Sequence, residues 1–239
     1  MNSASYEYNR QKNTTKLTSE NSELNDLLGG GFMPRTLYLL YGQRSVIKQI
    51  FLTLSVTAQL PRSLNGLNSQ VIYVDGDVSF DPYFISQKAV IKKLNPRHVL
   101  SRILISRFFT WEQTVDIVIN KMKELDAQLL LISGLTGMFD PKTQSCFGDL
   151  LKILGKLKKF ALEKNAVVVV STGYAQNSRF KPAGGKIMSH FVDVIIHVSE
   201  YQNRIEFYRL KGGRPQKNIL WKSNPIPLQR NLNYWLGES

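Results

Sequence analysis

The chain has 239 residues and a formal net charge of +13 at pH 7, from 31 lysines and arginines against 18 acidic residues. No run is long and apolar enough to span a bilayer, and the N-terminus lacks an apolar leader, so we expect a cytoplasmic protein without a membrane anchor. The large surplus of positive charge favours a polyanionic partner, nucleic acid first, over a merely solubilising surface.

Helical and strand-like segments alternate along most of the chain. Residues 1–16 are polar and predict a flexible N-terminal arm, followed by a single core domain over residues 17–239. Apolar periodicity predicts helices at 17–28, 45–60, 83–94, 111–125 and 150–162. Continuous apolar runs predict buried strands at 37–41, 71–75, 103–106, 129–132 and 167–170. Three closely spaced runs predict hairpin strands at 194–198, 205–210 and 218–221.

This alternation predicts an α/β fold with a mainly parallel, twisted sheet. We expect helices on both faces of the sheet, because its strands are apolar on both sides. The three late strands are expected to be antiparallel and to lie at the C-terminal edge.

The first predicted strand runs into a segment that resembles a phosphate-binding loop. Such a loop needs Gly, four residues, Gly, Lys and Ser or Thr. Gly42 and Lys48 have the required separation, but Ile47 replaces the second glycine and Gln49 replaces the hydroxyl that ligates magnesium. From these residues alone, the segment is either a damaged ATP site or a strand, turn and helix that never bound phosphate.

Four further motifs follow in a recognisable order. They are a leucine-rich helix with a glycine run at 22–32, a strand ending in carboxylates at 71–77, the segment 107–113, and Pro182-Ala183-Gly184-Gly185 with His190. Together with the segment at Gly42 they resemble the RecA/RadA recombinase core, particularly the short archaeal RadA paralogues of the RadB type. The resemblance runs from about residue 17 to residue 221 and implies a RecA-like P-loop NTPase core.

The departures from that family concern its chemistry. Ser133 stands where the family carries its magnesium-associated Asp, and Asp77 stands where it carries the catalytic Glu. Thr172-Gly173 replaces the pair that senses the γ-phosphate. The resemblance therefore implies a pseudo-ATPase with no catalytic residue and no metal site. ATP and Mg²⁺ are not required, and the nucleotide would be bound weakly at most.

The family's two DNA-contacting loops map onto segments of unequal charge. The first, 140–146, has Lys142 as its single cation. The second, 174–186, interleaves cations with an aromatic residue, a pattern that suits single-stranded DNA. The candidate DNA contacts are Arg179, Phe180, Lys181 and Lys186, together with Lys211 and Arg214 in a later hairpin turn. An open alternative is that Phe180 packs against the domain.

These residues predict a non-catalytic, nucleoid-associated paralogue that binds DNA, a RadA-type recombinase or another paralogue, and regulates recombination and repair. Residues 1–16 lack the Phe-x-x-Ala peptide with which filament-forming members dock to one another, so a monomer, dimer or hetero-complex is expected rather than a long filament. Two alternatives stay open. One is an active ATPase with Lys48 on the phosphates and Asp77 as general base, and the other is a protein-binding scaffold that never contacts DNA.

Overall fold

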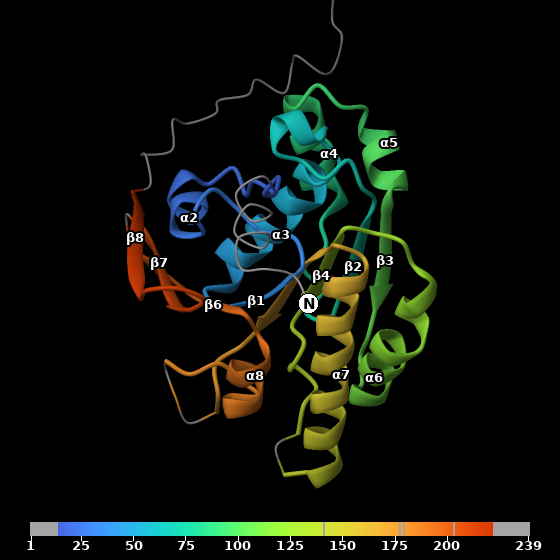
Figure 1. The fold of residues 1–239 in the computed structure, drawn as a ribbon, viewed down its shortest axis with the longest axis vertical. Coiled ribbons are helices and arrows are strands. Elements are labelled where there is room, and N and C mark those ends of the chain that lie inside the picture. The colour runs from blue at the N-terminus through green and yellow to red at the C-terminus, as the bar shows by residue number, and fades with distance from the viewer. Residues whose placement is uncertain (1–13, 141, 177, 179, 203, 222–239) are drawn as a thin grey trace, which may run out of the picture.

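One eight-stranded sheet organises the molecule (Figure 1). The computed structural model describes residues 14–140, 142–176, 178, 180–202 and 204–221. The strand order across the sheet is β3-β2-β4-β5-β1-β6-β7-β8. The strands are β1 (Thr36–Gly42), β2 (Val71–Asp75), β3 (Ile103–Arg107), β4 (Leu129–Ser133), β5 (Val167–Thr172), β6 (Val194–Tyr201), β7 (Arg204–Lys211) and β8 (Gln216–Trp221). Pairing is parallel from β3 to β6 and antiparallel from β6 to β8.

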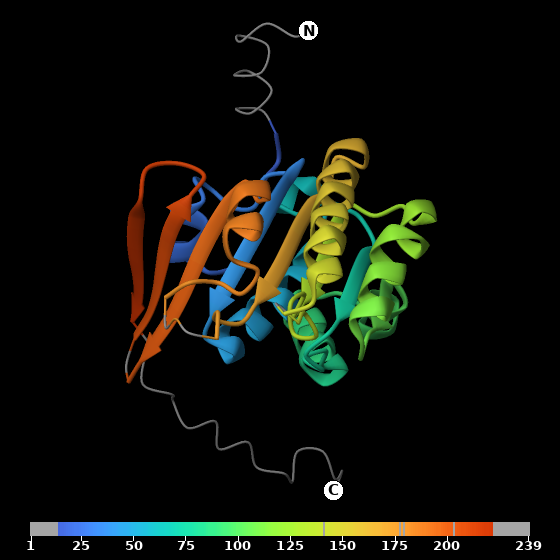
Figure 2. The same cartoon turned by 90° about the horizontal axis from the view of Figure 1, so that it is seen from below.

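Helices cover both faces of the sheet (Figure 2). One face carries α2 (Ser22–Leu27), α3 (Arg44–Thr57), α4 (Pro82–Ile91) and α5 (Pro96–Ser101). The other carries α6 (Trp111–Ile119), α7 (Gln144–Glu163) and α8 (Gly185–Phe191). Short 3-10 helices occupy Arg62–Leu64 and Lys121–Glu124. Alternate residues of each central strand enter opposite cores, which explains why these strands are apolar throughout.

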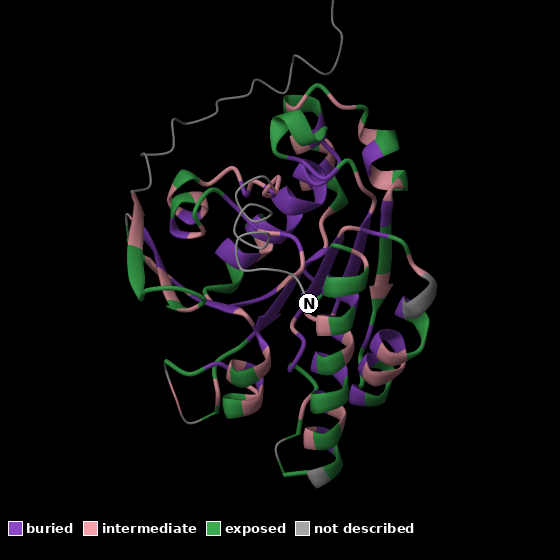
Figure 3. Cartoon of the chain, viewed as in Figure 1, coloured by how far each residue is buried: buried purple, intermediate pink, exposed green. Residues whose placement is uncertain are grey.

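The predicted α/β fold class is confirmed, including the antiparallel C-terminal edge. Every residue of β2, β4 and β5 is buried, and these strands stand out as the inaccessible centre of the molecule in Figure 3. A parallel sheet brings all carboxyl ends of β1 to β6 to one edge, where ligand sites of such sheets are formed. The predicted arm lies mainly outside the described residues, although Lys16 donates to the Gly29 carbonyl.

The predicted first helix, 17–28, was too long. Helix α2 begins only at Ser22, and the Asn21 side chain caps it by accepting from the Leu24 N–H at 2.8 Å. Leu17 instead pairs with Phe32 in an antiparallel bridge. Side-chain hydrogen bonds among residues 18, 19 and 25 compete with helix formation here, as Ser and Thr commonly do ahead of a helix.

Other boundaries differ in ways that affect the expected loops. Helix α7 begins at Gln144, six residues before the predicted start at 150, so the second half of the expected DNA loop 140–146 is helical. Helix α8 was not predicted, and it takes up Lys186 from the other expected loop. The predicted helix 111–125 ends as an α-helix at Ile119 and continues as a 3-10 turn. Helix α5 was also missed.

Gly42 lets the end of β1 approach β6 closely. It has φ of +120°, and a Cβ at this position would lie 2.0 Å from the carbonyl oxygen of Val198. We expect Gly42→Ala to lower the free energy of unfolding by roughly 2–4 kcal/mol, through backbone strain and overpacking. Urea denaturation measures this change.

Gly155 supplies the matched control, because a Cβ added there, in the interior of α7, meets nothing within 4 Å. Gly155→Ala should leave stability unchanged or raise it by about 0.5–1 kcal/mol. Equal effects of the two substitutions would contradict a close β1–β6 approach at Gly42.

Candidate functional site

The junction between β1 and α3 contains no extended loop. Strand β1 ends at Gly42, and α3 begins two residues later at Arg44, with Gln43 as its N-cap residue. The Gln43 N–H donates to the Val198 carbonyl at 2.9 Å, so the chain stays attached to β6 until the helix begins. The backbone between Gly42 and Gln49, where a phosphate-binding loop would curl, is therefore mostly helix.

This helical start determines where the two predicted phosphate contacts lie. Lys48 sits in the second turn of α3, and its ammonium pairs with the Asp81 carboxylate at 3.5 Å. Gln49 lies on the exposed side of the same helix. Asp81 also caps α4, and its pKa is lowered by the hydrogen bond from the Phe84 N–H and by the nearby Lys48 charge. Lys48 is thus partnered within the protein.

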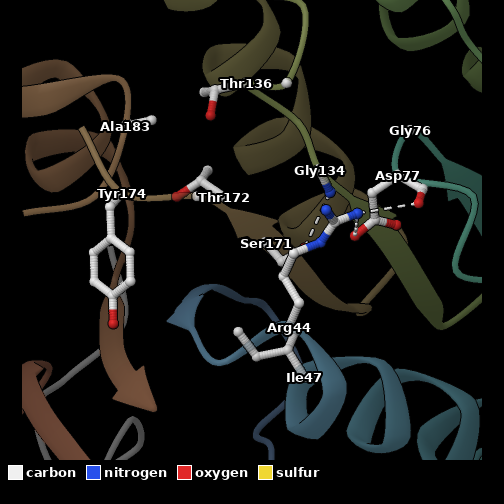
Figure 4. Close-up of a pocket in the computed structure, with 12 residues that line it drawn as sticks. Arg44, Ile47, Gly76, Asp77, Gly134, Thr136, Ser171, Thr172, Tyr174 and Ala183 are labelled. Atoms are coloured by element: carbon white, nitrogen blue, oxygen red, sulfur yellow. Dashed lines mark hydrogen bonds and ion pairs between the residues drawn. The ribbon is translucent and has the colours of Figure 1, made fainter. Parts of the chain in front are cut away.

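Arg44, which the sequence analysis did not single out, reaches the predicted catalytic position. Its guanidinium donates to the Asp77 carbonyl at 3.2 Å and lies 3.7 Å from the Asp77 carboxylate (Figure 4). The pair borders a cavity of about 410 Å³ at the carboxyl ends of β2, β4 and β5. Thr136 and Thr172 also line this cavity, and their buried hydroxyl groups have no hydrogen-bond partner. The Asp77 side chain therefore lines this cavity and is paired there with Arg44.

Ser133 belongs to a buried network around Asp75. The Ser133 hydroxyl donates to the Asp75 carboxylate at 3.1 Å, and the Ser79 N–H donates to the same oxygen at 2.8 Å. Arg107 pairs with the second carboxylate oxygen at 3.2 Å, and the Phe80 N–H also donates to that oxygen. Asp75 and Ser133 are register partners on β2 and β4. The carboxylate beside the end of β4 is therefore that of Asp75 on β2. Both of its oxygens already accept hydrogen bonds from protein donors.

Mg-ATP bound in the phosphate-loop manner needs free backbone N–H groups around the phosphates, a hydroxyl on the metal and an available carboxylate beside it. In the described residues, the segment 44–49 is helical, and the space for a Cβ at Gly42 is filled by the Val198 carbonyl. Lys48 and Asp75 are occupied by protein partners. These residues do not fit Mg-ATP in that mode.

The second predicted DNA loop is an anchored turn. Tyr174 and Pro182 form an antiparallel bridge, and the Ala183 N–H donates to the Gly173 carbonyl at 2.9 Å. The Tyr41 hydroxyl, at the end of β1, donates to the Phe180 carbonyl at 2.8 Å. Burial raises the pKa of Tyr41 to about 12, so this donor keeps its proton at physiological pH.

His197 fixes the other side of this turn. Its Nε2 lies 2.9 Å from the Tyr174 hydroxyl, and its ring contacts those of Tyr41 and Tyr208. Burial lowers the pKa of His197 below its usual value, which favours the neutral ring. The turn therefore rests on an aromatic cluster formed by the end of β1 and the middle of β6 and β7, and Phe180 remains at the surface.

The predicted DNA contacts differ in how accessible they are. Phe180 is 76% exposed at the tip of the turn, so the alternative that it packs against the domain is wrong. Lys181 and Lys186 are exposed and near it in sequence. The Lys211 ammonium instead donates to the carbonyls of residues 189 and 190 at the end of α8. Arg214 is exposed in the β7–β8 turn. Arg179 lies outside the described residues.

Comparison with known proteins places this fold and these motifs in one family. The Rad51 family model matches residues 10–206, more than half of the chain. This chain belongs to the Rad51 family. It is 30% identical over 199 residues to a meiotic recombination protein DMC1 homolog of Arabidopsis thaliana, which covers 76% of this chain and 58% of the relative.

Two further relatives give the same picture. A DNA repair protein RAD51 homolog 1 of Arabidopsis thaliana is 29% identical over 207 residues, covering 79% of this chain and 60% of that protein. Meiotic recombination protein DMC1 of Saccharomyces cerevisiae is 28% identical over 196 residues, covering 73% and 58%. This Rad51-family chain thus spans less than two thirds of these curated relatives. Among its described residues, no helix is long and apolar enough to cross a membrane.

The sequence of this Rad51-family chain did not predict three contacts around the candidate site, those made by Arg44, Arg107 and Tyr41. The contacts of Arg44 and of Arg107 depend on where a helix starts and which strands are neighbours. The contact of Tyr41 with the turn joins residues 139 positions apart. Placing Asp75 beside Ser133 would have required the pairing register of β2 and β4, which the structure supplies.

Restoring a carboxylate at position 133 tests the Asp75 network. Ser133→Asp would place two carboxylates side by side among buried donors that are already in use, and we expect a loss of roughly 2–4 kcal/mol in the free energy of unfolding at pH 7.5. Urea denaturation at pH 7.5 measures this change.

Ser133→Asn keeps a polar side chain without the added charge, and it should show a smaller loss. A Ser133→Asp variant as stable as the wild type, and further stabilised by Mg²⁺, would show that Asp75 is free to share a cation.

Proposed function

We propose that this chain is a DNA-binding recombinase paralogue of the Rad51 family that acts in homologous recombination and DNA repair without hydrolysing ATP. Membership of a family whose named members include DNA repair and meiotic recombination proteins supports the role in recombination. The net charge of +13 supports a nucleic-acid partner.

The observation that carries the DNA-binding proposal is the exposed Phe180 on an anchored turn beside Lys181. An aromatic ring that is 76% exposed leaves its face free for contact, and bases of single-stranded DNA stack on such rings. The Tyr41 hydrogen bond and the Tyr174–His197 contact hold the turn in place, which reduces the entropy lost on binding. Single-stranded DNA is therefore the preferred substrate in this proposal.

The absence of ATP hydrolysis is supported by the state of several site residues. The early start of α3 at Arg44, the Lys48–Asp81 pair and the Ser133–Asp75 contact each remove one part of the phosphate and metal machinery. Loss of a single electrostatic element of a catalytic site typically lowers the rate by about two powers of ten. ATP and Mg²⁺ are therefore not required in this proposal, and neither Asp77 nor Lys48 acts in catalysis.

A regulatory rather than filament-forming role completes the proposal. In this proposal the chain is a paralogue of the archaeal RadB type, which would meet a RadA-type recombinase or another paralogue at the nucleoid. Such a chain would act as a monomer, dimer or subunit of a hetero-complex, by capping, loading or remodelling a recombinase filament.

One observation favours an active ATPase as the second candidate. The cavity beside Asp77 is large enough for part of a nucleotide, and its Thr136 and Thr172 hydroxyls have no partner. Hydrolysis with Lys48 on the phosphates would, however, require Lys48 to leave Asp81 and the first turn of α3 to unwind. The first candidate needs neither rearrangement.

DNA binding is tested by fluorescence anisotropy with labelled single- and double-stranded oligonucleotides across a salt series, with and without Mg-ATP. We expect tighter binding to single strands, an affinity that falls steeply with salt, and no dependence on ATP. Phe180→Ala should weaken single-strand binding about tenfold or more through lost stacking, and Lys181→Ala should reduce the salt slope by about one.

Two control variants separate these effects from general charge loss. Lys93→Ala removes an exposed cation in the α4–α5 connection, and Lys48→Ala breaks a partly exposed ion pair; both should leave DNA affinity nearly unchanged. Binding that appears only with Mg-ATP and disappears in Lys48→Ala would establish the second candidate. No binding at any salt concentration would point to the protein scaffold.

A further inference from the structure

A second cavity lies between helix α6 and the start of helix α7, apart from the cavity beside Asp77. Its volume is about 640 Å³. Its apolar lining comes from Trp111, Val115, Met138 and Cys146. We call it the α6–α7 groove. It includes part of the segment 140–146, where the family's first DNA loop was expected, but its lining is apolar and acidic rather than basic.

The α6–α7 groove concentrates negative charge on a strongly basic protein. Four carboxylates line it: those of Glu112, Asp116, Asp140 and Asp149. Lysines pair with two of them, Lys121 with Asp116 at 3.0 Å and Lys152 with Asp149 at 3.2 Å. Within the described residues, Glu112 and Asp140 have no ion pair. DNA phosphates would be repelled by this surface.

Local hydrogen bonds favour the ionised form of three of these carboxylates. The Lys142 N–H and then the Thr143 hydroxyl lower the pKa of Asp140, and the Asn120 amide lowers that of Asp116. The pKa of Glu112 is lowered first by its own backbone N–H. The negative charge of the groove therefore persists over the whole physiological pH range.

A buried donor without a partner lies in the same lining. Trp111 is only 6% exposed, packs edge-to-face on Phe139, and leaves its indole Nε1–H without a hydrogen-bond partner. An unmet buried donor typically costs about 1–3 kcal/mol. The Nε1 atom is itself covered, so a ligand carbonyl would recover this cost only after a small shift of the ring exposes the N–H to the groove. A ligand for this groove thus carries an acceptor as well as positive charge.

We propose that the α6–α7 groove binds an extended, lysine- or arginine-containing peptide segment of a partner protein. Such a segment matches each feature of the groove. Its ammonium or guanidinium groups meet Glu112 and Asp140, its aliphatic stems cover Val115 and Met138, and a backbone carbonyl accepts from Trp111.

Other positively charged ligands match fewer of these features. A polyamine has no carbonyl for the indole N–H. A metal ion would need ligands gathered around one point, and no three such side chains among the described residues are close enough to hold one. The inference goes beyond the proposed DNA binding and does not rest on it, since the turn at Phe180 and the α6–α7 groove share no residue.

The test measures binding of a labelled, end-blocked 12-residue peptide that alternates lysine and leucine. Fluorescence anisotropy at low salt is the readout. We expect saturable binding that is about tenfold weaker for the Glu112→Gln/Asp140→Asn double variant and several-fold weaker for Trp111→Phe, which keeps the ring but loses the N–H. The glutamate–leucine analogue should not bind, and spermine should compete poorly. Single-strand DNA affinity should be unchanged or slightly raised in the double variant.

A matched control removes two carboxylates elsewhere. Asp126 and Glu163 form exposed ion pairs outside the groove, and Asp126→Asn/Glu163→Gln should leave peptide binding unchanged. Equal weakening by both double variants would overturn the proposal in favour of general charge attraction. Self-association of the chain in sedimentation experiments, abolished by Glu112→Gln/Asp140→Asn, would overturn it in favour of an interface between copies. A wild-type protein that fails to bind DNA but binds the lysine–leucine peptide as described would contradict the DNA-binding proposal and support the peptide-binding one.

Discussion

The close pairing of β1 with β6 determines the chemistry of the site. The Gly42 φ of +120° and the Gln43–Val198 hydrogen bond keep the chain on the sheet until α3 begins at Arg44. A phosphate-binding loop requires the opposite arrangement, a detour of several residues whose N–H groups point inward. The backbone of this segment is instead hydrogen-bonded as strand and helix, so its geometry as well as its side chains differ from those of a phosphate-binding loop.

The rest of the carboxyl edge is consistent with this constraint. Arg44 extends from the first turn of α3 to Asp77, and Asp75 gathers Ser133 and Arg107 around itself. These contacts join α3, β3 and β4 to the carboxyl end of β2 and the residues that follow it. Tyr41, at the end of β1, holds the turn that exposes Phe180, so the same strand that excludes the loop positions the candidate DNA contact.

The sequence predicted the sheet well because its strands are apolar on both faces, a pattern that a partly exposed strand would not show. The order of motifs along the chain predicted Asp77, Ser133 and the turn at Phe180 as positions of the candidate site. The sequence could not show that Lys48 pairs with Asp81 or that Lys211 caps α8, since both depend on packing between distant segments. The early start of α7 was missed because Gln144 follows a polar segment, and that error concealed the acidic α6–α7 groove.

The most direct test of this account is amide hydrogen exchange over residues 42–50, with and without Mg-ATP. The account predicts slow exchange at Ile47 and the following amides without nucleotide, because the Ile47 N–H already donates to Gln43 within α3, and no change on addition of Mg-ATP. Rapid exchange of these amides in the free protein, followed by protection when Mg-ATP is added, would contradict it. Such a result would show that the segment opens into a working phosphate-binding loop.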